Sequence, residues 1–448
     1  MSDLAKKVEH QSIIDMNESF RMDGKGFKLW VGFLLVIILV AMAAYIYQLT
    51  SGLRVTGMGN YVSWGMYMTN FVFFIGISHA GTLISAILRV TGAPWRRPIT
   101  RMAEAITLFA LMIGAPMVMI DMGRPDRVWH VFAYGRLNSP ILWDILSITT
   151  YVSGSLMYLY VALIPDLAIF VDKVKAPWQR KLFQKLSLGY KNTPEQEKIL
   201  NKALGAMCIV IIPVAISVHT VVSWIFSMTL RPGWHSTIFG PYFVVGAIFS
   251  GTAAIITAMI VFRWAYGLKK YLTMVHFKAL GKLMIALNAL YIYFTVSEYL
   301  TIWYGRHEVD HRLMEVITSG IYGKMWFFMW AFCLFLPLAL TVWFVMKKTE
   351  KYSLTIMMVA TILINIGMYI KRYLIIVPTM MTTYIPAEAA GVKISYMPTV
   401  IEWSITFGGL AMFMLLYTMF SKIFPIISVF EIIEGIHQEG IEKVGVEA

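Results

Sequence analysis

The stretch FVFFIGISHAGTLISAILR, residues Phe71–Arg89, contains a single histidine in an otherwise apolar and small-residue segment. An α-helix needs about 20 predominantly apolar residues to cross the hydrocarbon core of a bilayer, so the stretch predicts a membrane-spanning helix. Ionisable side chains at membrane depth are costly and usually face a bundle interior, which makes His79 a functional candidate. Its face of the helix carries Gly76, Thr82 and Ala86, small residues that let other helices pack closely. The alternative is a histidine that only hydrogen-bonds a neighbouring helix.

Working outward, the whole chain has the composition of a membrane protein. Of its 448 residues, 58% are hydrophobic and only 14% are charged, far more apolar sequence than one soluble core requires. We predict an all-α integral membrane protein with about ten transmembrane helices in a domain over residues 28–424. The expected helices are 28–49, 64–89, 100–121, 139–164, 199–224, 238–263, 279–301, 324–346, 352–376 and 398–424.

The distribution of positive charge predicts how the chain crosses the membrane. With both termini inside, 27 of the 38 Lys and Arg residues fall on the inner side, so the positive-inside rule favours cytoplasmic termini. We therefore expect a cytoplasmic N-terminal arm over residues 1–27 and a cytoplasmic tail over 425–448. The same rule explains the net charge of +13 without a nucleic-acid partner.

Four polar residues are expected in the membrane-spanning part of consecutive helices. Asp121 ends one helix at the outer side, and Asp144 lies one turn inside the next, after Ser-Pro at its start. His219 is close to the outer end of its helix, and His79 is nearer the middle. A quinol loses two protons as it loses two electrons, and carboxylates or histidines can hold its head group and accept a proton. A haem held by His79 and His219 is disfavoured because the two are expected at different depths.

A second set of charges lies further along the chain. Opposite charges at matching depth predict an ion pair or network that offsets their desolvation; its members are Glu298, Lys371, Arg372 and Glu402. Glu104 is expected near the inner side, where it either begins a proton path or simply snorkels towards the interface. The two cysteines, in separate apolar segments, cannot supply an iron–sulfur ligand set, and no His, Asp or Glu set has the spacing of a metal site.

Several long phrases of the chain resemble a known family. They closely resemble the polysulfide-reductase (NrfD/PsrC-type) membrane subunits, and within that family the ActC-type subunits of bacterial alternative complex III. The phrases are SWGMYMTNFVFFIGISHAGTLISAILRVTGAPWRRPITRMAE (63–104), SPILWDILSITTYVSGS (139–155), IPVAISVHTVVSWIFSMTLRPGWHSTIFGPYFVVGAIFSG (212–251) and IEWSITFGGLAMFMLLYTMFSKIFP (401–425).

This resemblance implies a ten-helix subunit of the bacterial inner membrane, built as two four-helix bundles plus two additional helices. It implies quinol oxidation, with menaquinol or ubiquinol as substrate and no haem or iron–sulfur cluster in the chain. His79 and Asp144, and Asp121 less directly, are implied at the quinol. His219, Glu104, Glu298, Lys371, Arg372 and Glu402 are implied as candidates for proton-conducting paths.

The resemblance also implies partners. These are a periplasmic iron–sulfur subunit, multihaem and monohaem c-type cytochromes, a paralogous NrfD-like membrane subunit, a terminal oxidase and the lipid bilayer. Relatives with this fold also serve polysulfide, sulfite or nitrite reductases, so the direction of the quinone reaction stays open. A secondary ion transporter and a purely structural anchor remain as alternatives from other classes.

Overall fold

The computed structural model describes residues 24–347, 353–385 and 394–435, together with positions 14, 19, 20 and 22. It contains ten helices long and apolar enough to span a membrane, and no strand occurs in the described residues, which confirms the predicted fold class. The spans are α2 (Lys25–Ser51), α3 (Met66–Val90), α4 (Thr100–Asp121), α6 (Pro140–Phe170), α8 (Pro194–Ser227), α9 (Phe239–Ala265), α10 (Met274–Gly305), α12 to α13 (Gly323–Met346), α14 (Ser353–Met381) and α15 (Val400–Ile423).

Several helices extend beyond the spans that hydropathy predicts. The predicted span 139–164 ends before Pro165, whereas α6 continues through that proline to Phe170. An internal proline removes one backbone hydrogen bond, and a packed membrane helix tolerates this because groups on neighbouring helices can satisfy the freed carbonyl. The eighth span also departs from regular geometry, because a π-helical turn over Met329–Phe335 (η5) separates α12 from α13.

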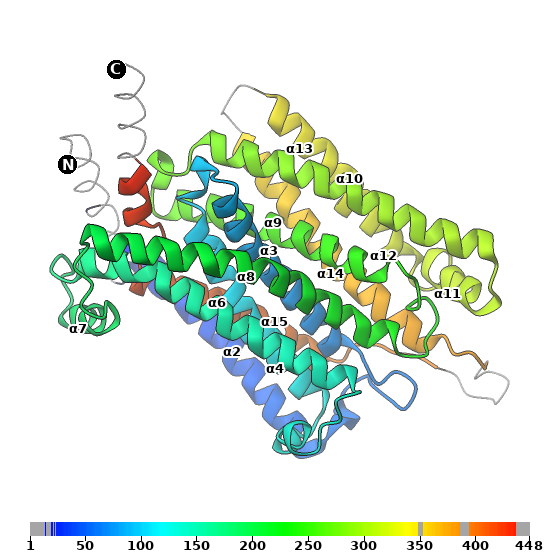
Figure 1. The fold of residues 1–448 in the computed structure, drawn as a ribbon. Coiled ribbons are helices and arrows are strands. Elements are labelled where there is room, and N and C mark those ends of the chain that lie inside the picture. Colours follow the sequence, from blue (N-terminus) through cyan, green and yellow to red (C-terminus); the bar gives the residue numbers. More distant parts are fainter. Residues whose placement is uncertain are drawn as a thin grey trace.

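The helices pack as two bundles of four plus two. One bundle consists of α3, α4, α6 and α8, and the other of α9, α10, α14 and the α12 to α13 span. We call them the first and second bundles. The remaining pair, α2 and α15, pack along each other, and α15 packs against α4 on one side of the first bundle (Figure 1).

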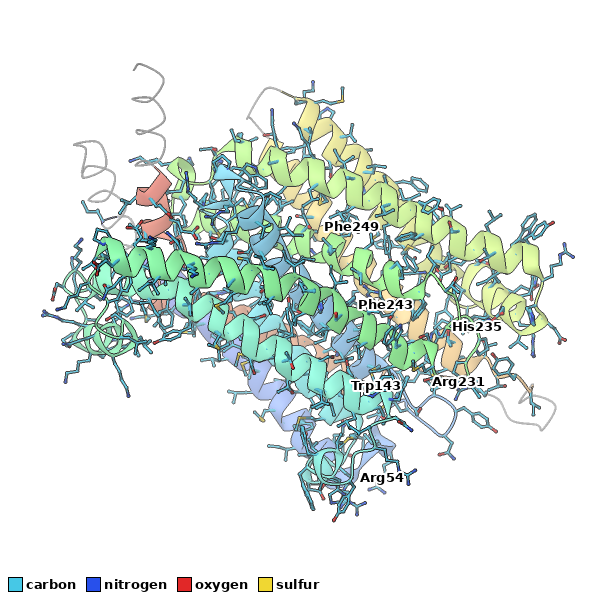
Figure 2. All side chains as sticks on the ribbon, viewed as in Figure 1. Arg54, Trp143, Arg231, His235, Phe243 and Phe249 are labelled. Carbon is cyan, nitrogen blue, oxygen red and sulfur yellow. The ribbon has the colours of Figure 1, made fainter. Side chains whose placement is uncertain are left out.

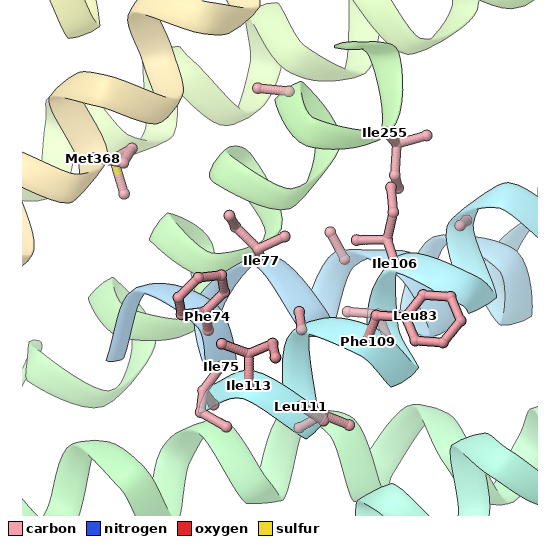
Figure 3. Packing of buried hydrophobic residues seen from close by; sticks show 14 of the residues in the cluster. Phe74, Ile75, Ile77, Leu83, Ile106, Phe109, Leu111, Ile113, Ile255 and Met368 are labelled. Atoms are coloured by element: carbon pink, nitrogen blue, oxygen red, sulfur yellow. The ribbon is translucent and has the colours of Figure 1, made fainter. Parts of the chain in front are cut away.

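Helix α3 is the centre of the molecule because it contacts both bundles. It packs on α4 and α8 in the first bundle and on α9 and α14 in the second. Glycines permit these close crossings: a Cβ at Gly81 would collide with the Ala103 carbonyl oxygen of α4, and one at Gly251 of α9 would collide with Ala80 Cβ. Figure 3 shows the apolar side chains of α3 and α4 that meet around this crossing.

The bundle has two ends. The proximal end is where α2 begins and α15 ends, joined by the Trp30–Thr418 hydrogen bond of 3.2 Å; it also holds α7 (Pro177–Leu186) and the helical segment 429–435. The distal end holds the other set of loops, with the short helices α5 (His130–Ala133) and α11 (Glu308–Thr318). Figure 1 shows α7 and α11 at opposite ends. Most of the predicted arm 1–27 lies outside the described residues, and the predicted tail 425–448 is described only as far as residue 435.

Candidate functional site

A cavity of about 350 Å³ lies at the distal end of the first bundle. Its walls come from α3, α4, α6 and α8, and its cover from Val128, Val131 and Phe132 of the loop between α4 and α6. The lining is almost wholly apolar, apart from the carboxylates of Asp121 and Asp144. Apolar cavities of several hundred Å³ with a few convergent polar groups are the common form of small-molecule sites.

Asp121 and Asp144 reach this cavity because of where their helices end and begin. Asp121 is the last residue of α4, whose interior proline, Pro116, also lines the cavity. Asp144 lies one turn into α6, which starts at Pro140 as predicted. Within the described part of the chain, Oδ1 of each carboxylate is buried and has no hydrogen-bond partner. Two carboxylates with an unsatisfied acceptor among the described residues therefore lie beside one apolar cavity.

His79 and His219 form a pair deeper in the bundle. Their ring centroids are 4.4 Å apart, so the expectation that they lie at different depths is wrong. Helix α8, which has Pro213 inside it, packs against α3 and places His219 beside His79. This contact leaves no room for a haem iron and its macrocycle between the rings. His79 Nδ1 lies 2.8 Å from the Ile75 carbonyl oxygen, which can only accept, so Nδ1 carries a proton. His79 Nε2 and both nitrogens of His219 have no partner among the described residues.

Tyr151 connects the histidine pair to the helix that carries Asp144. Its ring stacks on His79 at a centroid distance of 4.9 Å, and it lies two turns beyond Asp144 on the same face of α6. That separation is about 10 Å along the helix axis. His79 is not part of the cavity wall, so the structure places the two carboxylates together and the histidines one layer further in.

Polar contacts continue from the histidines towards the proximal end. Thr107 of α4 donates to the Ser78 carbonyl at 2.6 Å, and Ser85 donates to Glu104 at 2.7 Å. Ser85 also lies 3.4 Å from the Tyr158 hydroxyl, and Tyr158 follows Tyr151 by two turns along α6. The first bundle thus has a row of buried polar groups along most of its length.

An ionic network closes the proximal end of this row. Arg101 donates to Asp166 at 2.8 Å, and both side chains are buried. Asp166 also accepts from the Ser428 hydroxyl and the Phe430 N–H, so it holds the start of the C-terminal segment. Glu431 of that segment forms salt bridges of 2.9 Å to Arg89 and 3.0 Å to Arg96. Burial raises the pKa of Glu431, but the two arginines outweigh burial and hold its pKa below the ordinary value.

The second bundle contains the predicted ion pair. Lys371 Nζ lies 3.0 Å from Glu298 Oε2, and the ammonium also faces the rings of Tyr242 and Tyr299 at 5.2 and 5.3 Å. Tyr242 extends the network through a 2.8 Å contact with Thr295. Glu298 also lines a cavity of about 300 Å³ among the distal loop residues, which include His235 and Asp310. Figure 2 labels His235 at this end of the molecule.

Arg372 lies at the boundary between the bundles. Its guanidinium carbon is 4.7 Å from the centroid of Phe243, and His219 contacts the same ring at 5.9 Å. Phe243 is labelled on α9 in Figure 2. A Cβ added at Gly76 of α3 would lie 3.8 Å from Arg372 Nη2, so the guanidinium reaches α3 one turn before His79. Nη2 has no hydrogen-bond partner among the described residues.

Glu402 differs from the predicted arrangement. Its carboxylate accepts from the Gly57 and Thr399 N–H groups and from the Tyr396 hydroxyl, and it completes a capping box at the start of α15. Burial and the neighbouring carboxylate raise the pKa of Tyr396, which keeps this phenol a donor. Both oxygens of Glu402 are therefore engaged at the helix start, and the ion pair forms between Glu298 and Lys371 instead.

Sequence reasoning did not single out the tyrosines or Arg101. A signal for Tyr151 and Tyr158 was available, because both fall on the Asp144 face of one helix. Arg101 carries no such signal, since an arginine at a helix start is usually a solvated or snorkelling side chain. Its burial depends on Asp166 from another helix and on the C-terminal segment.

The fold and these sites define a polytopic α-helical membrane protein in which one of two four-helix bundles encloses a carboxylate-bearing cavity. The chain belongs to the polysulphide reductase, NrfD family, whose model matches residues 54–384. This confirms the resemblance to the NrfD family; the narrower resemblance to ActC-type subunits stays a prediction.

Individual relatives are distant in sequence but cover much of the chain. A selenate reductase subunit of Mesobacillus selenatarsenatis is 23% identical over 94% of this chain and 99% of its own length. The Hdr-like menaquinol oxidoreductase integral membrane subunit of Archaeoglobus fulgidus is 24% identical over 88% of this chain and 93% of its own. A putative dimethyl sulfoxide reductase membrane subunit of Halobacterium salinarum is 27% identical over 54% of this chain and 52% of its own. The relatives are thus subunits of oxidoreductases.

Proposed function

We propose that the chain is the quinol-oxidising membrane subunit of a respiratory complex, of the kind found in alternative complex III. The observation that carries the proposal is the cavity of the first bundle, which is apolar apart from Asp121 and Asp144; Oδ1 of each carboxylate has no hydrogen-bond partner among the described residues. An apolar cavity suits a quinol ring, and free carboxylates suit its two hydroxyl groups. The name of the Archaeoglobus relative, a menaquinol oxidoreductase subunit, supports the same substrate class.

The chemistry follows from what a quinol releases. Oxidation to the quinone yields two protons and two electrons. Asp144 and Asp121 can accept hydrogen bonds from the two hydroxyls and then take their protons, as general bases positioned in the cavity. The electrons pass to an iron–sulfur subunit at the distal face and from there to c-type cytochromes. His79 and Tyr151, one layer deeper, are the next groups able to receive a proton from Asp144.

The test measures quinol oxidation by the assembled complex. Asp144→Asn and His79→Ala are compared with Asp126→Asn, a matched control because that carboxylate is exposed at the same end and paired with Arg124. Loss of a positioned base lowers the rate by about 10²- to 10⁴-fold, so we expect a drop of this order for Asp144→Asn. The control retains activity. Wild-type rates and quinol affinity in both site variants would rule out the assignment.

The direction of the reaction is a separate question, because relatives carry names of reductases. The same cavity would bind a quinone, and protonated carboxylates would then donate. The partners that co-purify distinguish the two directions. Cytochromes and an iron–sulfur subunit would favour quinol oxidation, and the catalytic component of a polysulfide, sulfite or nitrite reductase would favour a reductase-type complex. Solitary purification with solute uptake would instead favour an ion transporter.

We further propose that quinol oxidation is coupled to proton translocation through both bundles. In the first bundle the row of buried polar groups begins at His79 and continues through Glu104 to Asp166 and Glu431 at the proximal end. In the second bundle Glu298 lines the cavity of about 300 Å³ among the distal loop residues and forms a salt bridge with Lys371. Arg372 lies between the two, and His219 and Arg372 have nitrogen atoms without a partner among the described residues, which can hold bridging waters.

Proton movement by the reconstituted complex tests this coupling. Glu298→Gln removes the acid beside the distal loop cavity but leaves the quinol cavity untouched. We expect quinol oxidation to continue while proton release beyond the scalar protons of the quinol is lost. Turnover by the unsubstituted complex with only scalar release would remove the proposal, without affecting the assignment of quinol oxidation.

A further inference from the structure

Helix α7 connects two membrane spans at the proximal end and has two different faces. Gln179 and Phe183 are buried: the Gln179 side chain donates to the Ile423 carbonyl at 2.7 Å, and Phe183 stacks on Phe424. These contacts fix the helix against the end of α15. The opposite face is therefore held in one orientation, away from the protein.

The outward face of α7 combines an aromatic side chain with lysines. Trp178, Lys181 and Lys185 follow a spacing of three and four residues, which places them on one side of the helix, opposite the buried pair. Trp178 is 51% exposed, and both lysines are exposed. Lys175, just before the helix, is also exposed. Surfaces that lie in the headgroup layer of a bilayer are enriched in tryptophan and lysine.

A strained leucine follows the helix. Leu188 has φ of 51° and a side chain that is 71% exposed. A left-handed conformation costs a non-glycine residue about 1–2 kcal/mol, and here it presents an apolar side chain outside the protein. An apolar side chain in water gives no free energy to offset this strain, whereas its transfer into the acyl chains of a bilayer does. The exposed Ile199 of α8, which begins just after this turn, belongs to the adjoining apolar surface of that span.

The positive charge on the outward face of α7 favours anionic lipids. Arg180 on the flank of α7 is paired with Asp172 at 2.5 Å, so the acidic residue next to the helix does not neutralise the lysine face. Lysine clusters beside a transmembrane helix attract anionic phospholipids, and ionic screening weakens the attraction. We propose that α7 is an anionic-phospholipid-binding element, with Lys181 and Lys185 on the headgroups and Trp178 and Leu188 in the interface.

Fluorescence quenching by brominated lipids tests the proposal on the full-length protein in nanodiscs. The Trp178 signal is the difference between the unsubstituted protein and Trp178→Phe. We expect stronger quenching by brominated phosphatidylglycerol than by brominated phosphatidylcholine at equal mole fraction, and less preference at high salt. The double variant Lys181→Gln/Lys185→Gln should lose this preference by on the order of tenfold in relative affinity.

Arg180→Gln is the matched control, because it removes a charge from the same helix but off the lysine face. It should keep the preference for phosphatidylglycerol. Equal quenching by the two lipids, or an equal loss in Arg180→Gln, would overturn the proposal. Absence of quenching by either lipid would show that α7 lies outside the bilayer and would also overturn it. Loss of an acidic subunit from the lysine variant would identify a protein-docking surface instead.

Discussion

Replacement of Glu298 by glutamine should destabilise the protein because it leaves a buried ammonium without its counter-charge. Lys371 is only 3% exposed and Glu298 12%, and their charged atoms are 3.0 Å apart. Removing one partner of a buried ion pair costs about 3–5 kcal/mol. The tyrosine rings at 5.2 and 5.3 Å from Lys371 Nζ still stabilise the cation, so we expect the lower end, about 3 kcal/mol.

A double-variant cycle measures this cost. Glu298→Gln, Lys371→Met and the combined variant are unfolded in mixed micelles, and the free energy of unfolding of each is compared with that of the parent. The combined variant has no buried charge at the site, so we expect it to recover most of the loss. If the combined variant is as unstable as the sum of the single variants, the two residues are uncoupled. The buried pair would then not explain the stability of this region.

Three further predictions concern packing and the C-terminal segment. Gly251→Leu should cost about 1–3 kcal/mol or more, because its Cβ would collide with a side-chain carbon of α3, whereas Gly205→Ala, with open space, should be nearly neutral in the same thermal unfolding assay. Asp166→Ala should cost about 3–5 kcal/mol by leaving buried Arg101 unpaired, and unchanged stability would contradict the network. Since the folded pKa of Glu431 is depressed, its stabilising effect is present above the unfolded pKa and is lost as pH falls through the folded pKa. Hydrogen exchange of segment 428–435 should thus stay slow below the ordinary glutamate pKa of about 4.3, and fast exchange already above it would refute this.

Part of the candidate site could be predicted from the depth at which individual polar residues lie in their helices. Asp121 and Asp144 were expected in the outer half of neighbouring helices, and the structure brings both to one cavity. The depth of His219 was misjudged, because counting residues from a helix end assumes a straight helix at a standard tilt. Helix α8 has 34 residues, longer than the predicted span 199–224, and contains Pro213, so depth counted from the predicted end is not a guide to which residue of α3 it meets. The role of Glu402 at a helix start was also missed, although the Thr-x-x-Glu spacing of a capping box was present at residues 399–402.

The sequence by itself determined the number of spans, their approximate bounds and the polar residues that must be explained. These follow from the bilayer, which demands long apolar helices and makes each buried charge costly. Only the tertiary structure decided which polar groups meet: His79 with His219, Arg101 with Asp166, and Lys371 with Glu298. The reason is that such partners lie on different helices, and their meeting depends on crossing points set by small side chains and helix bends, which no single helix encodes.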